Sequence, residues 1–397
     1  MPLAWGGNLE VSPAVALDRA PAPEEFPFVV MTRLLSFRNF SGFPFAVSAS
    51  PKTCEAVADK ALSLFAKRRD HSIWRLSDCP PHVLRLLRER HLLPSRSLPF
   101  PGKKGSKYLA VAPGAKSWAL VNEVEHLTFG QVFPGRLAAA EFASAYLLPP
   151  EEPSDETAKE RSEDSPEAKS LKVLPSKEIL SRPVGGDQRL PWSWSRTLGY
   201  LSSNPERIGP ALEIEMLVHL PGLALARKLP QARNAMSALG VASSPVSALE
   251  NGEAEAGLFL LKSRGGSGKS AHRVYTEFLG SVQPLLEWER SLQRRCLEKH
   301  HKRLEDRVQD SLRRLARAAV LSYPELLALS SYLRLGAYLA LLPAQITAIA
   351  EELRVVAGSG HLGVSSGRTE SGCILAKEEE DIRRANVVRL ALETLHV

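Results

Sequence analysis

The longest regular pattern in the sequence occupies its C-terminal part. Over residues 271–318, apolar side chains recur at the three- and four-residue spacing of an α-helix, and no proline follows Pro284. Further helical segments are predicted at about 323–340, 343–356 and 378–395. This pattern predicts an all-helical C-terminal domain, so any β-sheet has to be built from the residues before it.

The residues before this region mix strand and helix patterns. ALEIEMLVHLP (211–221) alternates as a half-buried strand does, and AGLFLLK (256–262) is typical of a buried strand. WALVNEVEHLTFGQVF (118–133) predicts two strands, or one strand with a bend. Together with helical patterns, these strands predict an α+β domain. The helical patterns lie at 52–67, 80–91 and 230–242.

Two segments lack the composition of folded structure. Residues 1–26 are rich in Pro and Ala and predict a disordered N-terminus without a signal peptide, because no basic start is followed by an apolar stretch. An acidic insertion at about 149–185, rich in Pro, Ser and Glu, has few large apolar side chains and is also predicted to be disordered. The chain is thus predicted to hold a domain over 27–288, interrupted by this insertion, and a helical domain over 289–397.

The composition indicates a globular protein and limits the cellular compartments in which it is expected. Hydrophobic residues make up 44% of the chain, which is enough for a sizeable core. The cysteines show no C-x-x-C spacing, so the sequence favours neither a metal site nor a disulfide framework and fits a reducing, cytoplasmic compartment. No uninterrupted apolar run reaches about 18 residues, so no membrane span is expected.

The stretch SRGGSGKS (263–270) ends in the Gly-Lys-Ser of a phosphate-binding loop. A P-loop also needs an opening glycine, where this chain has Ser263, and an acidic metal-binding strand further along, which the sequence lacks. We therefore predict a flexible turn between a strand and a helix, with a P-loop as the alternative.

The basic segment 294–318 raises the question of nucleic-acid binding. A DNA-binding face concentrates Lys and Arg on one side of a helix. Here acidic residues interleave with the bases at helical contact spacings, which predicts a solvated helix with salt links. Nucleic acid is therefore not an expected partner, although the net charge of +7 permits an anionic one. The interleaved acids are Glu298, Glu305, Asp306 and Asp310.

Four stretches, in order along the chain, resemble one family. They are FVVMTRLLSFRNFSGFPF (28–45), VNEVEHLTFGQVFPG (121–135), LGYLSSNPERIGPALEIEMLVHLPGL (198–223) and LEDRVQDSLRRLARAAVLSYPELLALSSYLRLGAYLALLP (304–343). The first three resemble the ATP:guanidino phosphotransferases, and more specifically the bacterial protein-arginine kinases. The fourth resembles the helical C-terminal part of that bacterial branch. The resemblance implies an antiparallel sheet flanked by helices, a nucleotide bound on that sheet by scattered arginines, and a homodimer formed by the C-terminal domain.

Phosphoryl transfer to a guanidinium needs cations that neutralise and align the triphosphate. In the resemblance, Arg33, His91 and His126 match nucleotide-binding positions. Other phosphate-binding arginines of the family are replaced, in one case by an acid. The replaced positions are Leu35, Thr128 and Glu213.

The positions that the resemblance assigns to binding and deprotonating the acceptor guanidinium also carry different residues. The family's catalytic base falls on Val124, between Glu123 and Glu125. Neighbours on a strand point to opposite faces, so neither acid replaces the base directly. The family's reactive cysteine falls on Asn204. Glu123, Glu125 and Asn204 are thus the candidates for the catalytic positions.

A second site is implied near the C-terminus. EDIRRA (380–385) resembles a phosphoarginine-binding motif in which Asp381 and Arg384 match and Glu380 replaces an arginine. The alternative is an amphipathic helix with charge pairs four residues apart.

Scaffold positions remain while phosphate- and guanidinium-binding positions have mostly changed, and such losses should abolish useful turnover. We therefore predict a catalytically impaired pseudokinase that acts by protein binding in stress response or protein quality control. The partners implied by the resemblance are an active kinase paralogue, a zinc-containing activator or Clp-type protease machinery. The alternative is a divergent kinase that phosphorylates protein arginines with Mg-ATP, using Arg33, Glu123, Glu125 and a further cation. Candidates for that cation are Lys262, Arg264 and Lys269.

Overall fold

The computed structural model of the chain describes residues 26–66, 71–93, 106–139, 141–142, 192–246, 257–366 and 375–393. Residues 1–25 of the predicted N-terminal segment and the whole predicted insertion at 149–185 lie outside the described residues. Phe26 is described and buried, with 5.6 Å between its ring centroid and that of Phe28. Phe26 therefore belongs to the packed core.

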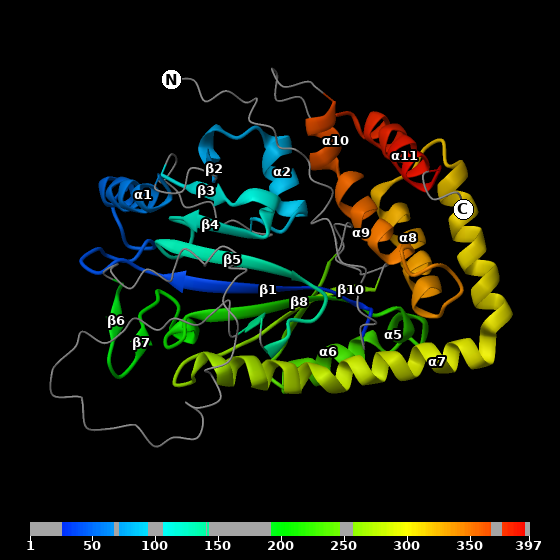
Figure 1. The fold of residues 1–397 in the computed structure, drawn as a ribbon, viewed down its shortest axis with the longest axis horizontal. Coiled ribbons are helices and arrows are strands. Elements are labelled where there is room, and N and C mark those ends of the chain that lie inside the picture. Colours follow the sequence, from blue (N-terminus) through cyan, green and yellow to red (C-terminus); the bar gives the residue numbers. More distant parts are fainter. Residues whose placement is uncertain are drawn as a thin grey trace, which may run out of the picture.

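The centre of the molecule is an antiparallel sheet (Figure 1). Its strands are β1 (Val29–Arg38), β2 (Ser72–Arg75), β3 (Tyr108–Val111), β4 (Ser117–Val121), β5 (Leu127–Pro134), β8 (Leu212–His219), β9 (Ala242–Pro245) and β10 (Leu258–Lys262). Their order in the sheet is β2-β3-β4-β5-β1-β8-β10-β9, and every neighbouring pair is antiparallel. A separate small hairpin joins β6 (Trp194–Ser195) and β7 (Gly199–Tyr200). The segment 118–133 thus forms two strands, the first of the two predicted alternatives.

Some helices pack on this sheet, and the helices that follow β10 form the C-terminal region (Figure 1). The predicted helices are all present, which confirms the α+β class followed by helices. Of the helices that the structure describes in full, the sequence patterns missed two short ones, α5 and α10. The bounds are α1 (Pro51–Ala66), α2 (Pro81–Glu89), α5 (Pro221–Leu225), α6 (Leu229–Ala238), α7 (Ala271–Arg317), α8 (Tyr323–Tyr338), α9 (Ile346–Val356), α10 (Ser359–Ser365) and α11 (Lys377–Glu393).

The two faces of β8 have different surroundings. Ile214, Met216 and Val218 lie in a core that the sheet shares with α7. The alternate residues point to the opposite face, because side chains alternate along a strand. There Leu217 packs against Leu327 of α8. The central strand is therefore covered by helices from both the middle and the C-terminal part of the chain.

Helix α7 is continuous except at His300, whose backbone angles are φ −138° and ψ 29°. The helix follows the sheet first and turns toward α8 and α11 afterwards (Figure 1). Neither a proline nor a glycine stands at the kink, and nothing in the structure explains it. The predicted domain boundary between residues 288 and 289 falls within the unbroken first part of α7, and the division into domains stays a prediction.

Glu289 joins α7 to α5 in the core. Its side chain is fully buried, and its carboxylate accepts hydrogen bonds from the main-chain nitrogens of Gly222 at 2.6 Å and Leu223 at 2.8 Å. Gln293 donates to the same carboxylate at 2.7 Å. A side chain at position 222 would collide with it, since a Cβ there would lie 2.9 Å from Glu289 Oε1. Glu289 therefore satisfies the free amides at the start of α5.

The free energy of unfolding is expected to fall as the pH rises from about 4.5 to about 7. Burial raises the pKa of Glu289 from 4.5 to about 7, despite its hydrogen bonds. The unfolded chain loses this proton first, so rising pH favours unfolding by on the order of 3 kcal/mol across this window. Urea unfolding at several pH values should show the fall in the wild type and in Glu287→Gln, an exposed site on the same helix. A fall that persists in Glu289→Gln would contradict this assignment.

Candidate nucleotide site

Cross-strand pairing brings the predicted nucleotide positions onto one face of the sheet. Arg33 on β1 lies opposite Glu215 on β8, and Leu35 lies opposite Glu213. Thr128 on β5 pairs with the β1 residue two positions after Leu35. Directly opposite residues, and residues two apart on a strand, have their side chains on the same face. The four positions that the resemblance assigned to phosphate-binding arginines are therefore neighbours.

Arg33 is held by Glu215. The Arg33 residue is 6% exposed, its Nε donates to Glu215 Oε2 at 2.6 Å, and its Nη2 contacts the same oxygen. Its Nη1 donates to the main-chain carbonyl of His91. All three guanidinium nitrogens therefore have an acceptor within the chain.

Two more cations join this pair. Lys262 on β10 contacts Glu215, and its Nζ lies 3.6 Å from Glu213 Oε1. Arg207, from the turn before β8, donates from Nη2 to Glu213 Oε2 at 3.3 Å and stacks 3.9 Å above the ring of Phe37. Glu215 thus contacts Arg33 and Lys262, and Glu213 lies within 3.6 Å of Arg207 and Lys262. The ion-pair cluster consists of Arg33, Arg207, Glu213, Glu215 and Lys262.

The two acids of the cluster differ in their titration. Burial raises the pKa of Glu215, but Arg33 and Lys262 outweigh it and bring the pKa down to about 2. Burial and the neighbouring Glu215 raise the pKa of Glu213 above its ordinary value. Glu215 is therefore strongly stabilised in its ionised form, whereas the ionised form of Glu213 is disfavoured.

The residues present do not fit a triphosphate. A triphosphate needs several cations with free donors, usually arginine forks. Leu35 and Thr128 carry no charge, and Glu213 adds a negative charge at a position where the resemblance implies an arginine. Arg33 and Lys262 already contact carboxylates. A nucleotide would have to displace these internal ion pairs before its phosphates could bind.

Glu125, in the loop between β4 and β5, accepts hydrogen bonds from two other loops. It is fully buried, and its carboxylate accepts from Asn39 Nδ2 at 2.6 Å and from the main-chain nitrogen and hydroxyl of Ser203 at 3.2 and 3.0 Å. The hydroxyl of Ser202 contacts it as well. With this many donors, Glu125 serves as an acceptor within the fold.

Glu123 and Asn204 are also engaged. Lys107 Nζ donates to Glu123 Oε2 at 2.6 Å, and Glu123 is 5% exposed. The side-chain oxygen of Asn204 accepts from the main-chain nitrogen of Glu206 at 3.0 Å, which caps a 3₁₀ turn. The structure places Glu123, Glu125 and Asn204 on adjoining loops, and their catalytic role stays a prediction.

The two histidines of the predicted nucleotide site make different contacts. His126 is fully buried, its Nδ1 accepts from the amide of Phe40 at 3.0 Å, and its Nε2 therefore donates to the carbonyl of Pro44 at 2.9 Å. Burial lowers its pKa. His91 adopts a left-handed backbone with φ 57° and presents its carbonyl to Arg33. His126 thus fixes a loop, and His91 borders the ion-pair cluster.

The C-terminal motif forms internal contacts. Arg384 is 1% exposed, and it donates to the carbonyls of Ala357 at 2.8 Å and Leu321 at 2.9 Å and contacts Asp381. Glu380 lies 3.6 Å from the Arg384 Nη2. Asp381 and Arg384 therefore hold α11 against its neighbours, and phosphoarginine binding by them stays a prediction.

The glycine-rich segment is a turn, as predicted. The strand before it, β10, pairs antiparallel with both of its neighbours, whereas a P-loop follows a strand of a parallel sheet. Ser270 caps α7 by accepting from the amide of Arg273 at 3.2 Å. Lys269 Nζ donates to Glu277 at 2.7 Å. The P-loop alternative is therefore wrong.

The basic segment carries fewer salt links than the sequence predicts. Of its four interleaved acids, Glu305 alone has an ion-pair partner among the described residues, namely His301 at 3.9 Å. Arg314 pairs with Glu325 of α8 at 2.6 Å. The four acids are exposed, so the solvated helix is as predicted, but Glu305 alone among them shows a predicted salt link in the described residues.

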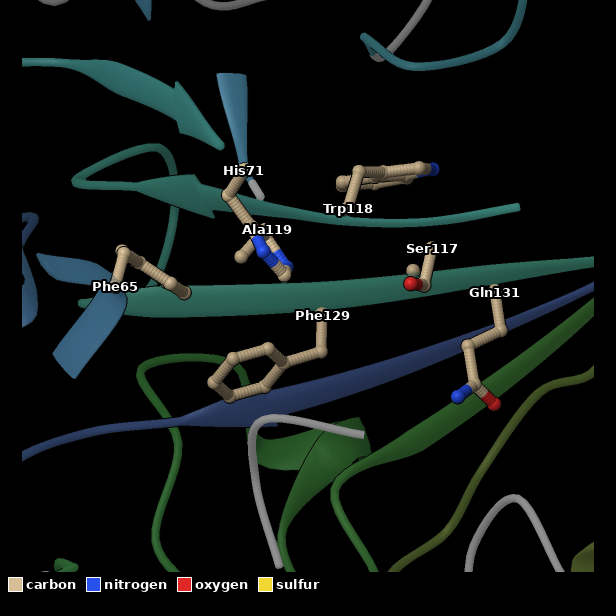
Figure 2. A pocket seen from close by; sticks show the side chains of 8 residues that line it. Phe65, His71, Ser117, Trp118, Ala119, Phe129 and Gln131 are labelled. Atoms are coloured by element: carbon tan, nitrogen blue, oxygen red, sulfur yellow. The ribbon is translucent and has the colours of Figure 1, made fainter. Parts of the chain in front are cut away.

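Two small cavities lie in the described part of the chain. The first, about 20 Å³, is bordered by Phe65 at the end of α1 and by residues of β4 and β5, including Trp118 and Gln131 (Figure 2). The second, about 10 Å³, lies beside His219, between the sheet and α8. Sites for drug-sized ligands are typically 300–1,000 Å³ in volume, so neither cavity holds a nucleotide.

The described residues contain neither a helix long and apolar enough to cross a membrane nor a group of three His, Cys, Asp or Glu side chains placed to hold a metal ion.

Two families match the chain in adjacent parts. Residues 185–292 match the family described as "ATP:guanido phosphotransferase, C-terminal catalytic domain", and residues 301–397 match "Protein-arginine kinase McsB C-terminal domain". The protein-arginine kinase of Halalkalibacterium halodurans is 25% identical over 371 residues, which cover 92% of each chain. Residues 185–292 thus belong to the ATP:guanido phosphotransferase family. The kink at His300 lies between the two matched regions.

Two further comparisons are consistent with this match. The protein-arginine kinase of Bacillus licheniformis is 30% identical over 207 residues, covering 52% of this chain and 55% of that protein. A structure of the duplicated taurocyamine kinase from Schistosoma mansoni, with bound transition state analog components, has a TM-score of 0.50 at 16% identity. It covers 73% of this chain and 38% of the other, and it supports the fold.

Sequence reasoning missed the central partner of the cluster, Glu215. The signal was present, since Glu213 and Glu215 are alternate residues on a strand whose other positions are apolar. Two acids on one face of a central strand require cations or hydrogen-bond donors near them, and here they have cations. Which cations these are follows from the pairing of β8 with β1 and β10, which the sequence does not state.

Proposed function

We propose that this member of the ATP:guanido phosphotransferase family is a pseudokinase that acts by binding other proteins. The observation that carries the proposal is the ion-pair cluster. Where relatives are expected to bind phosphates with arginines, this chain has Glu213 and Glu215 paired with its own cations. The homodimer and the protein partners that the resemblance implies are part of the same proposal.

The size of the expected loss supports this choice. Removing one phosphate-binding cation or a catalytic base commonly costs about 10²–10⁴ in rate. Here Leu35, Thr128 and Val124 carry no charge at positions that need one, and Glu213 carries the opposite charge. Even if these losses are not additive, turnover falls below a useful level.

The purified full chain is expected to transfer no phosphate from labelled Mg-ATP to an arginine-rich unfolded protein or to free arginine. Acid-labile label is the readout, with an active family member as the positive control. Titration calorimetry with Mg-ATP is expected to show no binding at concentrations that saturate the control.

Clear acid-labile label on protein arginine would overturn the pseudokinase and establish the divergent kinase. In that case the variants Glu123→Gln and Lys262→Met identify the substitute base and cation. Nucleotide binding without transfer would leave a protein that senses ATP, and it would overturn the statement that the cluster excludes a triphosphate.

A further inference from the structure

Helix α2 joins the sheet to the C-terminal helices through one of its faces. Leu87 packs in the core formed with α1 and β2–β5. His82, Leu86 and Glu89, at positions i, i+4 and i+7, form another face of the helix. This face lies against α10 (Figure 1).

Helix α10 meets α2 through glycines. A Cβ at Gly360 would lie closer than 3.0 Å to the main-chain nitrogen of Leu86, and one at Gly363 would lie 2.8 Å from the Cβ of His82. Neither position can hold a larger residue unless a backbone moves. The two helices therefore touch main chain to main chain, which gives the contact a single geometry.

A carboxylate fixes the same contact. Glu89, the last residue of α2, accepts from the amides of Gly360 at 2.9 Å and His361 at 3.3 Å. Burial raises the pKa of Glu89, and its bonds to these two amides oppose that rise. At the same end of α10, Ser359 donates to Glu380 of α11 at 2.7 Å. The start of α10 is thus hydrogen-bonded to both α2 and α11.

The chain that leaves α2 borders the candidate site. Only Arg90 separates Glu89 from His91, whose carbonyl accepts from Arg33 Nη1. The Nε2 of the His91 ring is buried and has no hydrogen-bond partner among the described residues. Burial, with Arg354 and Arg33 nearby, lowers the pKa of His91 to about 3. A displacement of the end of α2 would therefore move the residue that holds Arg33.

We propose that α10 is a clamp that, through Gly360 and Glu89, fixes the end of α2 and so positions His91 against Arg33 at the candidate site. The C-terminal helical region thereby controls the geometry of a site on the central sheet. The contact is made by two helices and not by the strands of the sheet, so it can open while the sheet stays folded. This inference does not depend on whether the site transfers phosphate.

Hydrogen exchange followed by mass spectrometry on the full chain tests the clamp. In Gly360→Ala, the amides of residues 83–91 are expected to exchange at least about ten-fold faster than in the wild type, while those of β1 and β8 keep their rates. Glu89→Gln is the milder variant, with an expected increase of about three-fold in the same segment. The control is Gly280→Ala in α7, where a Cβ meets nothing within 4 Å and no change is expected.

A second readout reports on the site. Titration of His91 by NMR should show its pKa rising from about 3 toward the ordinary value of 6.5 in Gly360→Ala, because the ring becomes solvated. The charges around the ring are those of Arg33, Arg354, Glu215 and Glu351.

Three outcomes would overturn the clamp. Unchanged exchange in residues 83–91 of folded Gly360→Ala would show that α10 does not hold α2. Equal acceleration throughout the chain would show that the contact is an inseparable part of the fold. Faster exchange of α2 with an unchanged His91 pKa would show that α10 does not position the site.

Discussion

Glu215→Gln is expected to destabilise the protein by about 3–5 kcal/mol, because it leaves the buried Arg33 without a carboxylate. The side chains of Arg33 and Glu215 are 7% and 1% exposed, so water cannot replace the lost partner. The glutamine keeps the size and an acceptor but removes the charge. Chemical denaturation at neutral pH measures the change as a lower midpoint with an unchanged slope.

Glu213→Gln is the matched control on the same strand and face. Glu213 is more exposed, its ion pairs are 3.3 and 3.6 Å long, and its pKa is raised. Its loss should therefore change stability by less than about 1 kcal/mol. The double variant Arg33→Leu/Glu215→Leu should recover much of the stability lost in Glu215→Gln, since an apolar pair needs no desolvation. Equal effects of Glu213→Gln and Glu215→Gln would refute this description of the cluster.

Arg384→Ala is the second substitution with a large expected effect, about 3–5 kcal/mol. The buried guanidinium satisfies the carbonyls of Leu321 and Ala357 and contacts Asp381. Alanine leaves all three acceptors without this donor and opens a cavity beneath α11. Thermal and chemical unfolding measure the loss.

Arg383→Ala supplies the comparison one residue away. The Arg383 side chain is 36% exposed and pairs with Glu379 at 3.0 Å, an interaction worth about 0–1 kcal/mol. Phosphoarginine binding, if it occurs, would add a third result: phosphoarginine should raise the melting temperature of the wild type. A near-neutral Arg384→Ala would show that the residue is not structural and would favour a ligand-binding role for it.

Arg33 connects the two proposals. Its Nε and Nη2 face Glu215 in the ion-pair cluster, and its Nη1 faces the carbonyl of His91 at the end of α2. The same arginine that the resemblance assigned to a nucleotide is thus fully used inside the fold. Its retention in the sequence is explained by structure and does not by itself indicate catalysis.

Sequence patterns predicted the elements well where the pattern was long. The 3.6-residue period predicted α7, α8, α9 and α11, alternation predicted β8, and a short apolar run predicted β10. The short helices α5 and α10 were missed, because five to seven residues do not complete two turns of a period. The kink at His300 was also missed.

The sequence by itself determined the fold class, the family resemblance and the absence of charge at Leu35, Thr128 and Val124, because these depend on residue identity and local order. Only the tertiary structure decided what the remaining charged residues do. Arg33, Glu215 and Lys262 come from strands far apart in the chain, and their pairing follows from strand order and register. The same holds for Glu89 and Gly360, which lie 271 residues apart. Charge neutralisation in a buried site depends on distances of a few ångströms, and such distances are set by packing across the whole chain.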